Sequence, residues 1–166
     1  MSQVEIEITN YQKAVVLDRR KIRKTVGYVL RQFGIEEACV SIAVVEHDRI
    51  TELKERYFGR KISTDVISFD LQEAAGDPDE KVSMDCEIVV NGQQAAEWAE
   101  AHGTEAEAEL HLYIVHGLLH QLGYDDQTAE EAGKMHKKEN QFLEKLGFGK
   151  VYRIKKRKDS CTRGRS

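Results

Sequence analysis

The stretch His116-Gly-Leu-Leu-His120-Gln-Leu-Gly123-Tyr-Asp-Asp126 carries three side chains that can bind a metal ion, at its first, fifth and last positions. On a helix, His116 and His120 are one turn apart and project from the same face, so both imidazoles can reach one ion. Gly123 is expected to end that helix, because glycine adopts the left-handed cap conformation without a Cβ clash. The reversal can bring Asp126 back over the histidines. Three protein ligands with a fourth position open are typical of catalytic zinc.

Two histidines four residues apart can also be ordinary residues of a buried helix. Here, however, the two histidines lie in a stretch that is otherwise apolar, namely Leu112, Tyr113, Ile114, Val115, Leu118, Leu119 and Leu122. Unpaired imidazoles in such surroundings would cost several kcal/mol unless they were ligated or hydrogen-bonded. We therefore favour a metal site carried by a helix of residues 105 to 122.

The spacing H-x-x-x-H-x-x-G-x-x-D is similar to the extended zinc signature of metzincin-type peptidases, with one difference. Gly117 stands where the peptidases have a glutamate. That glutamate is the general base of peptide hydrolysis. Ordinary peptidase activity is therefore not expected.

The string from His116 to Asp125 resembles the signature of the YbeY family of endoribonucleases, H-G-x-L-H-L-x-G-Y-D-H. The resemblance continues in residues 63 to 69, S-T-D-V-I-S-F, which are similar to the family's P-T-D-V-L-S-F, and extends to about residue 147. It implies a single-strand-specific endoribonuclease that acts in ribosomal RNA maturation and ribosome quality control. The implied partners are ribosomal RNA and the small ribosomal subunit, and the implied cofactor is one divalent ion, Zn²⁺, held by His116, His120 and Asp126.

Four positions depart from the family pattern: Asp126 replaces the third histidine, Cys86-Glu87 a glycine-aspartate pair, Ser63 a proline and Phe58 an arginine. A carboxylate at position 126 keeps a ligand but changes its charge and softness, which leaves the identity of the metal open. Two other classes of function stay open as well. One is a non-catalytic, metal-containing ribosome-assembly factor, which Phe58 favours, and the other is a metal-dependent hydrolase of a different substrate.

If the family arginine holds a phosphate, another cation must do so here, and Arg60 or Arg56 is the nearest candidate. In an extended segment Arg60 would leave the chain on the same side as Phe58 and would reach the same groove. An ordinary surface arginine is the alternative, because arginine is mostly exposed. The residue that transfers the proton is not determined by the sequence.

Two more residues can contribute to the site. The simpler interpretation of His136 is an ordinary helix histidine, but it can also support a metal ligand from behind, or replace Asp126 if that side chain points away. Glu87, at the end of a predicted strand, can orient a ligand or the substrate, but an ordinary strand carboxylate is the simpler interpretation.

The chain as a whole predicts one α+β domain over residues 1–147. Its 166 residues are 40% hydrophobic, enough for one sizeable core. Strands are predicted at 4–8, 40–45, 65–71 and 86–90, and about five helices are predicted at 22–33, after Asp48, from Gly92, and from Thr104 and Thr128, each of which begins a capping-box pattern. We expect a four-stranded mixed sheet in which the first three strands are parallel and the fourth is antiparallel. The absence of a membrane span or a basic, apolar leader predicts a cytosolic protein without membrane contact.

Residues 148–166 form a basic tail with eight lysines and arginines and one acid, Asp159, a net charge of +7. Because the whole chain carries −4, residues 1–147 carry −11. Charge runs are usually solvated and disordered. A cationic tail on an acidic body also provides phosphate contacts, and the candidates for RNA binding are Lys155, Lys156, Arg157 and Lys158.

Overall fold

The computed structural model describes residues 2–72 and 83–149. In this part of the chain, four strands form one sheet in the order β1-β2-β4-β3. The strands are β1 (Gln3–Asn10), β2 (Glu37–Val45), β3 (Val66–Asp70) and β4 (Ser83–Asn91). The helices are α1 (Arg19–Gln32), α2 (His47–Phe58), α3 (Gly92–His102), α4 (Ala106–Gln121) and α5 (Ala129–Lys145).

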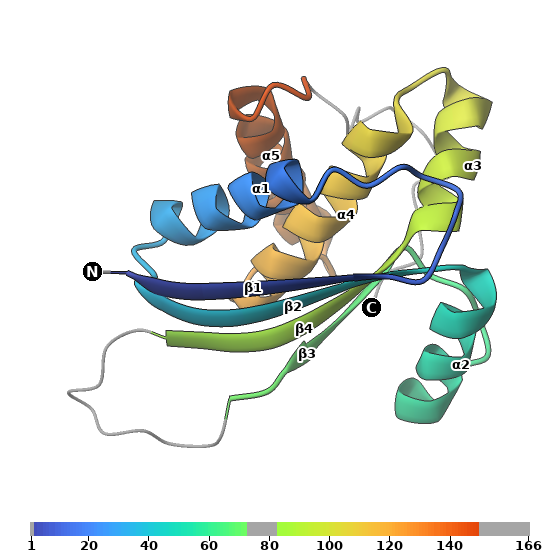
Figure 1. Ribbon diagram of the computed structural model, residues 1–166, viewed down its shortest axis with the longest axis horizontal. Coiled ribbons are helices and arrows are strands. Elements are labelled where there is room, and N and C mark those ends of the chain that lie inside the picture. The colour runs from blue at the N-terminus through green and yellow to red at the C-terminus, as the bar shows by residue number, and fades with distance from the viewer. Residues whose placement is uncertain (1, 73–82, 150–166) are drawn as a thin grey trace.

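The sheet is mixed, with three parallel strands and one antiparallel strand, as predicted. The parallel set is β1, β2 and β4, however, and β3 is the strand that runs antiparallel, at the edge beside β4. The prediction that the first three strands run parallel was wrong. It assumed that the helix between β2 and β3 makes a right-handed crossover, but α2 lies on the opposite face of the sheet from the other helices (Figure 1).

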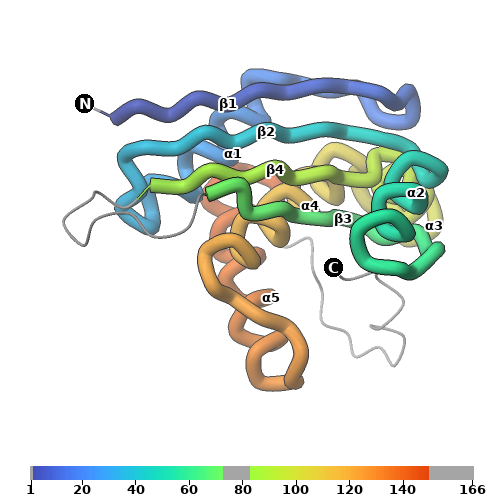
Figure 2. The backbone as a smooth tube through the Cα atoms, turned by 90° about the horizontal axis from the view of Figure 1, so that it is seen from below, coloured from blue at the N-terminus to red at the C-terminus, as the bar shows by residue number. Residues whose placement is uncertain are grey.

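The main core lies between the sheet and the layer formed by α1, α3, α4 and α5 (Figures 1 and 2). In β1 the apolar residues Val4, Ile6 and Ile8 pack toward this core, and the alternating acidic residues Glu5 and Glu7 are exposed. A smaller apolar cluster lies under α2 on the other face. Among the described residues, no helix is both long and apolar enough to cross a membrane.

Helix α4 lies very close to the sheet at Gly117. A Cβ at this position would lie 2.9 Å from Cγ2 of Ile88 and 3.0 Å from Cγ2 of Val66. Any side chain here would therefore push α4 away from β3 and β4. Position 117 faces the packed sheet, which explains in physical terms why the glutamate of peptidases is absent.

Of the predicted helix caps, Thr128 is confirmed, whereas Asp48 and Thr104 are wrong; α3 begins at Gly92, as predicted. Thr128 and Glu131 form the predicted capping box at the start of α5. Asp48 does not cap α2, because the N-cap is Glu46 and Asp48 lies inside the first turn. Thr104 donates its backbone N–H to a carbonyl of α3, so it belongs to the end of that helix, and α4 begins beyond it without a side-chain cap.

Candidate metal centre

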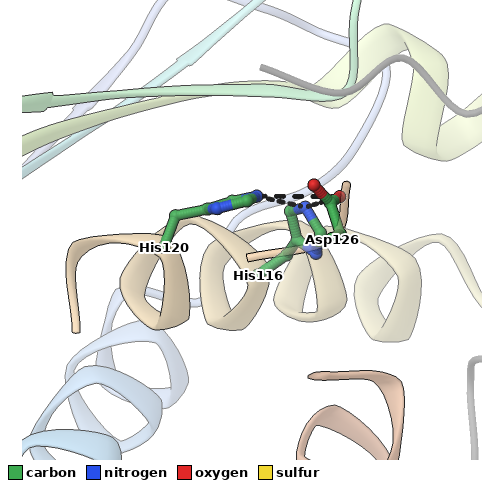
Figure 3. A group of neighbouring side chains, drawn as sticks. All are labelled: His116, His120 and Asp126. Atoms are coloured by element: carbon green, nitrogen blue, oxygen red, sulfur yellow. Dashed lines mark hydrogen bonds and ion pairs between the residues drawn. The ribbon is translucent and has the colours of Figure 1, made fainter. Parts of the chain in front are cut away.

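The three predicted ligands meet at one end of α4. His116 and His120 lie in the last turns of this helix, and Asp126 lies in the segment that leads to α5. Helix α4 ends at Gln121, and Gly123 follows with φ +97°, the left-handed conformation expected from the sequence. The chain then reverses, and the three side chains point toward one another (Figure 3). Their potential ligand atoms all lie within 4.8 Å of one another.

The distances in this cluster suit a tetrahedral ion. His116 Nε2 and His120 Nε2 are 3.0 Å apart, and Asp126 Oδ2 lies 3.6 Å from the first and 3.8 Å from the second. Ligand atoms about 2.0–2.2 Å from a tetrahedral zinc are separated by roughly 3.3–3.6 Å. Two imidazoles and a carboxylate are also ligands that zinc accepts. The donor set and its spacing therefore fit a zinc-like divalent ion.

The second ring nitrogen of each histidine is held by another group. His116 Nδ1 lies 2.6 Å from Oε1 of Glu139, a residue of α5 that is 1% exposed. His120 Nδ1 lies 3.1 Å from the carbonyl oxygen of Tyr124. When both Nδ1 atoms donate, both Nε2 atoms present a lone pair to the same point. This carboxylate–histidine arrangement is the usual support of a metal-binding imidazole.

The other carboxylate oxygen of Glu139 lies 3.0 Å from Nδ1 of His136. His136 therefore stands behind Glu139 and does not replace Asp126, which points at the two histidines (Figure 3). The sequence analysis singled out His136 but did not predict a role for Glu139. An acidic residue among the apolar positions of a predicted helix could have identified it, because Met135, Glu139 and Phe142 are all buried on one side of α5.

Electrostatics of the site favour an ionised Glu139 and a neutral His120. Burial alone would raise the pKa of the Glu139 carboxyl, but the charge and the hydrogen bonds of His116 and His136 hold it at about 2. Burial alone would lower the pKa of His116, but the interaction with Glu139 outweighs it and raises that pKa. Burial and the charge of His116 lower the pKa of His120. Proton release from His116 would accompany the binding of a cation.

The region around Phe58 differs from the sequence prediction. Phe58 is the last residue of α2, and Gly59 caps the helix with φ +70°. Residues 58 to 60 therefore do not form an extended segment, and the prediction that Phe58 and Arg60 leave the chain on one side was wrong. The Phe58 ring stacks on Phe69, with ring centroids 6.2 Å apart. Arg60 is exposed, and its charge acts on Lys54 of α2.

Arg56 and Glu87 lie away from the metal cluster. Both line a groove of about 770 Å³ that is formed by α2 and the outer face of the sheet, together with Tyr57 and Phe69. Glu87 therefore acts as a strand carboxylate on the face opposite to α4. The predicted RNA-binding residues, Lys155 to Lys158, lie outside the described residues. Phe148, at the start of the predicted tail, packs on the domain: the centroid of its ring lies 4.3 Å from that of the His111 ring.

Comparison with known proteins agrees with the motif and the fold. A family profile described as Endoribonuclease YbeY matches residues 7–147. The chain belongs to the YbeY family. A YbeY endoribonuclease from Syntrophus aciditrophicus is 38% identical over 142 residues, which cover 83% of this chain and 87% of the relative. One from Bacillus velezensis is 33% identical over 150 residues, 86% of this chain and 96% of that protein.

A solved structure supports the same fold. The solution structure of a Thermotoga maritima protein matches with a TM-score of 0.57 and 25% identity, covering 85% of this chain and 88% of that protein. The family profile and this structure each match nearly the whole described domain.

The first prediction concerns the three ligands. Replacing both His116 and His120 with alanine should remove the bound ion, and Asp126→His should strengthen zinc retention, because imidazole binds zinc-like ions more tightly than carboxylate. Elemental analysis after dialysis against a chelator measures both effects, with His102→Ala, an exposed histidine of α3, as the control. Full occupancy in the double variant would refute the site. Unchanged or weaker retention by Asp126→His would exclude Asp126 as the third ligand.

The second prediction concerns Glu139. Glu139→Gln keeps the shape of the side chain but removes the charge that orients His116, so zinc affinity should fall by roughly 10- to 100-fold. Competition with a fluorescent zinc chelator measures the affinity. Glu144→Gln, an exposed residue of the same helix, is the matched control and should bind like the parent. Equal affinities in the parent and Glu139→Gln would show that this carboxylate does not support the ion.

Proposed function

We propose that this protein is a single-strand-specific endoribonuclease that acts in the cytoplasm in ribosomal RNA maturation and ribosome quality control. The observation that carries the proposal is the convergence of His116, His120 and Asp126 within 4.8 Å in a member of the YbeY family. The relatives bear the name endoribonuclease, which supports RNA as the substrate. Zn²⁺ is the proposed ion, held by the two Nε2 atoms and the Asp126 carboxylate, and the small ribosomal subunit is the proposed partner.

When bound, the ion would polarise a phosphoryl oxygen or lower the pKa of a water for attack on phosphorus. The protein orients the ligands around it. Glu139 accepts the Nδ1–H of His116, and the Tyr124 carbonyl accepts that of His120, so the two Nε2 atoms face the same point. Asp126 adds a negative charge that a histidine would not carry. The developing charge on the phosphate oxygens therefore needs a nearby cation more than it would with three histidines.

A cleavage assay tests the function. The zinc-loaded protein should cut a single-stranded RNA oligonucleotide and leave the same sequence intact in a duplex, and the His116→Ala/His120→Ala variant should be inactive. Cleavage that survives in that variant would come from another nuclease. If the folded, metal-loaded parent cuts no RNA with Zn²⁺, Mn²⁺ or Mg²⁺, the proposal is wrong. RNA binding without cleavage would then favour the non-catalytic assembly factor, which Phe58 in place of arginine already favours.

We also propose that Arg60 contacts the phosphate in place of the family arginine. It lies two residues beyond Phe58, and its charge reaches Lys54 on the adjoining helix. Arg60→Ala should lower RNA cleavage by at least about 10-fold with unchanged metal content, the scale expected when one electrostatic interaction with the transition state is removed. Arg56→Ala, which removes an arginine of the outer groove, is the control. Near-normal cleavage by Arg60→Ala would exclude this role.

The basic tail is proposed to contact RNA through Lys155, Lys156, Arg157 and Lys158. Deletion of residues 150–166 should leave the fold intact, weaken RNA binding and flatten its salt dependence. The slope of the logarithm of the binding constant against the logarithm of the salt concentration should fall in magnitude by about 0.7 for each phosphate of a single strand that the tail neutralises. Binding titrations at several salt concentrations measure the slope. An unchanged slope would mean that only residues 1–149 contact the phosphates. Unfolding of the truncated protein would mean that the tail is needed for the fold.

A further inference from the structure

A hydrogen-bonded group of four polar side chains lies at one end of the sheet and shares no residue with the metal cluster. His47 is the first residue of α2, Asn91 is the last of β4, Glu97 lies on α3, and Ser63 precedes β3. The parallel strands β2 and β4 end here side by side, and the antiparallel β3 begins here, with α2 and α3 at the same end (Figure 1). The carboxyl ends of parallel strands are a common place for ligand sites.

Asn91 fixes the direction of the hydrogen bonds in this group. It is fully buried, and its Oδ1 accepts the backbone N–H of Gln94 at 2.9 Å as the N-cap of α3. The donor Nδ2 therefore faces the other way, 3.1 Å from Oγ of Ser63 and 3.1 Å from the carbonyl oxygen of Thr64. With a hydrogen bond from Asn91 to its oxygen, Ser63 has its own hydroxyl hydrogen left to donate.

His47 is oriented as a base toward Ser63. Its Nε2 lies 2.9 Å from Oε2 of Glu97, and because a carboxylate only accepts, Nε2 carries the ring hydrogen. Nδ1 then carries the lone pair, and Oγ of Ser63 lies 3.0 Å from it. The amide nitrogen of Asn91 also lies 2.9 Å from Nδ1, and a donor at this distance agrees with a lone pair there. The hydroxyl of Ser63 therefore donates to a basic nitrogen.

Glu97 is held on both of its carboxylate oxygens. Oε2 accepts from His47, and Oε1 lies 3.3 Å from Nε2 of Gln93. The hydrogen bond from His47 is the main cause that lowers the pKa of Glu97, so the carboxylate is ionised. An ionised carboxylate behind an imidazole stabilises the imidazolium that forms when the ring takes a proton. Serine, histidine and carboxylate in this order form the arrangement of an activated nucleophile, here with the two ring nitrogens in exchanged roles.

Ser63 is accessible and belongs to this chain in particular. The residue is exposed, so a small molecule can reach Oγ. It stands where the family pattern has a proline, which carries no hydroxyl. A nucleophile at this position is therefore not part of the family signature. The bonds of Ser63 and His47 could also be structural and only tie α2, the segment before β3 and α3 together.

We propose that Ser63 is a nucleophile that accepts an acyl group from a small activated ester, with His47 as its base and Glu97 as the residue that positions His47. Oγ of Ser63 attacks the carbonyl carbon, and its proton passes to Nδ1 of His47. The π electrons of the carbonyl move to its oxygen, to which the Asn91 amide can donate. When this intermediate collapses, the bond to the leaving oxygen breaks and that oxygen takes the proton from His47. The products are acylated Ser63 and an alcohol.

Acetylation of the full chain by p-nitrophenyl acetate tests the proposal. Peptide mapping by mass spectrometry gives the rate at each serine, so hydrolysis of the ester at the metal centre does not interfere. Ser63 should react at least about 100-fold faster than Ser2, an exposed serine, because a general base typically contributes this much. His47→Gln should remove the difference. His102→Gln, which changes an exposed histidine of α3, should preserve it.

The role of Glu97 has its own measurement. Its side chain is 59% exposed, so Glu97→Ala should leave the fold intact. Nitrogen-15 NMR should show the hydrogen of His47 on Nε2 in the parent and a loss of this preference in Glu97→Ala, together with a decrease of at least about 10-fold in the acetylation of Ser63. A purely structural group would leave Ser63 as slow as Ser2 in every variant.

Equal acetylation of Ser63 and Ser2 in the parent would overturn the proposal, and so would an unchanged rate at Ser63 in folded His47→Gln. If His47→Gln does not fold, Glu97→Ala decides. The decrease of at least about 10-fold then supports the proposal, and an unchanged rate overturns it.

Discussion

The contact between α4 and the sheet at Gly117 is the constraint on which the rest of the site depends. Because no Cβ intervenes, the helix lies directly on Val66 and Ile88. This contact fixes the distance between α4 and the sheet, and with it the positions of His116 and His120 on the adjoining helix face. It also holds Val66, the first residue of β3, against the helix next to His116. A larger residue at position 117 would move the helix and separate these groups.

A second consequence of the close packing is a concentration of buried charge. Helix α5 contributes Glu139, which contacts His116 at 2.6 Å and His136 at 3.0 Å. Asp126 approaches the histidines from the other side, with 5% of its side chain exposed. Buried carboxylates are costly unless cations pair with them. A divalent ion would supply much of the missing positive charge, so its binding should also stabilise the fold. Catalysis and folding thus share one set of interactions.

Local chemistry explains what the sequence predicts well. The histidine spacing, the glycine reversal at Gly123 and the capping box at Thr128 each depend on residues within one or two turns. Glu139 was missed because it meets His116 across 23 residues, through the packing of α5 on α4, and no spacing rule gives that contact. The direction of β3 was missed because α2 crosses on the unexpected face (Figure 1). The direction of the Arg60 side chain was misjudged because a helix cap, not an extended strand, follows Phe58.

Crystallography of the zinc-loaded protein at the zinc absorption edge tests the central claim most directly. We expect one anomalous peak at about 2.0–2.2 Å from Nε2 of His116, Nε2 of His120 and a carboxylate oxygen of Asp126. Glu139 should still contact Nδ1 of His116, as it does here at 2.6 Å. An anomalous peak elsewhere in the domain, or an ion bound to the histidines while Asp126 points away, would contradict the proposed centre.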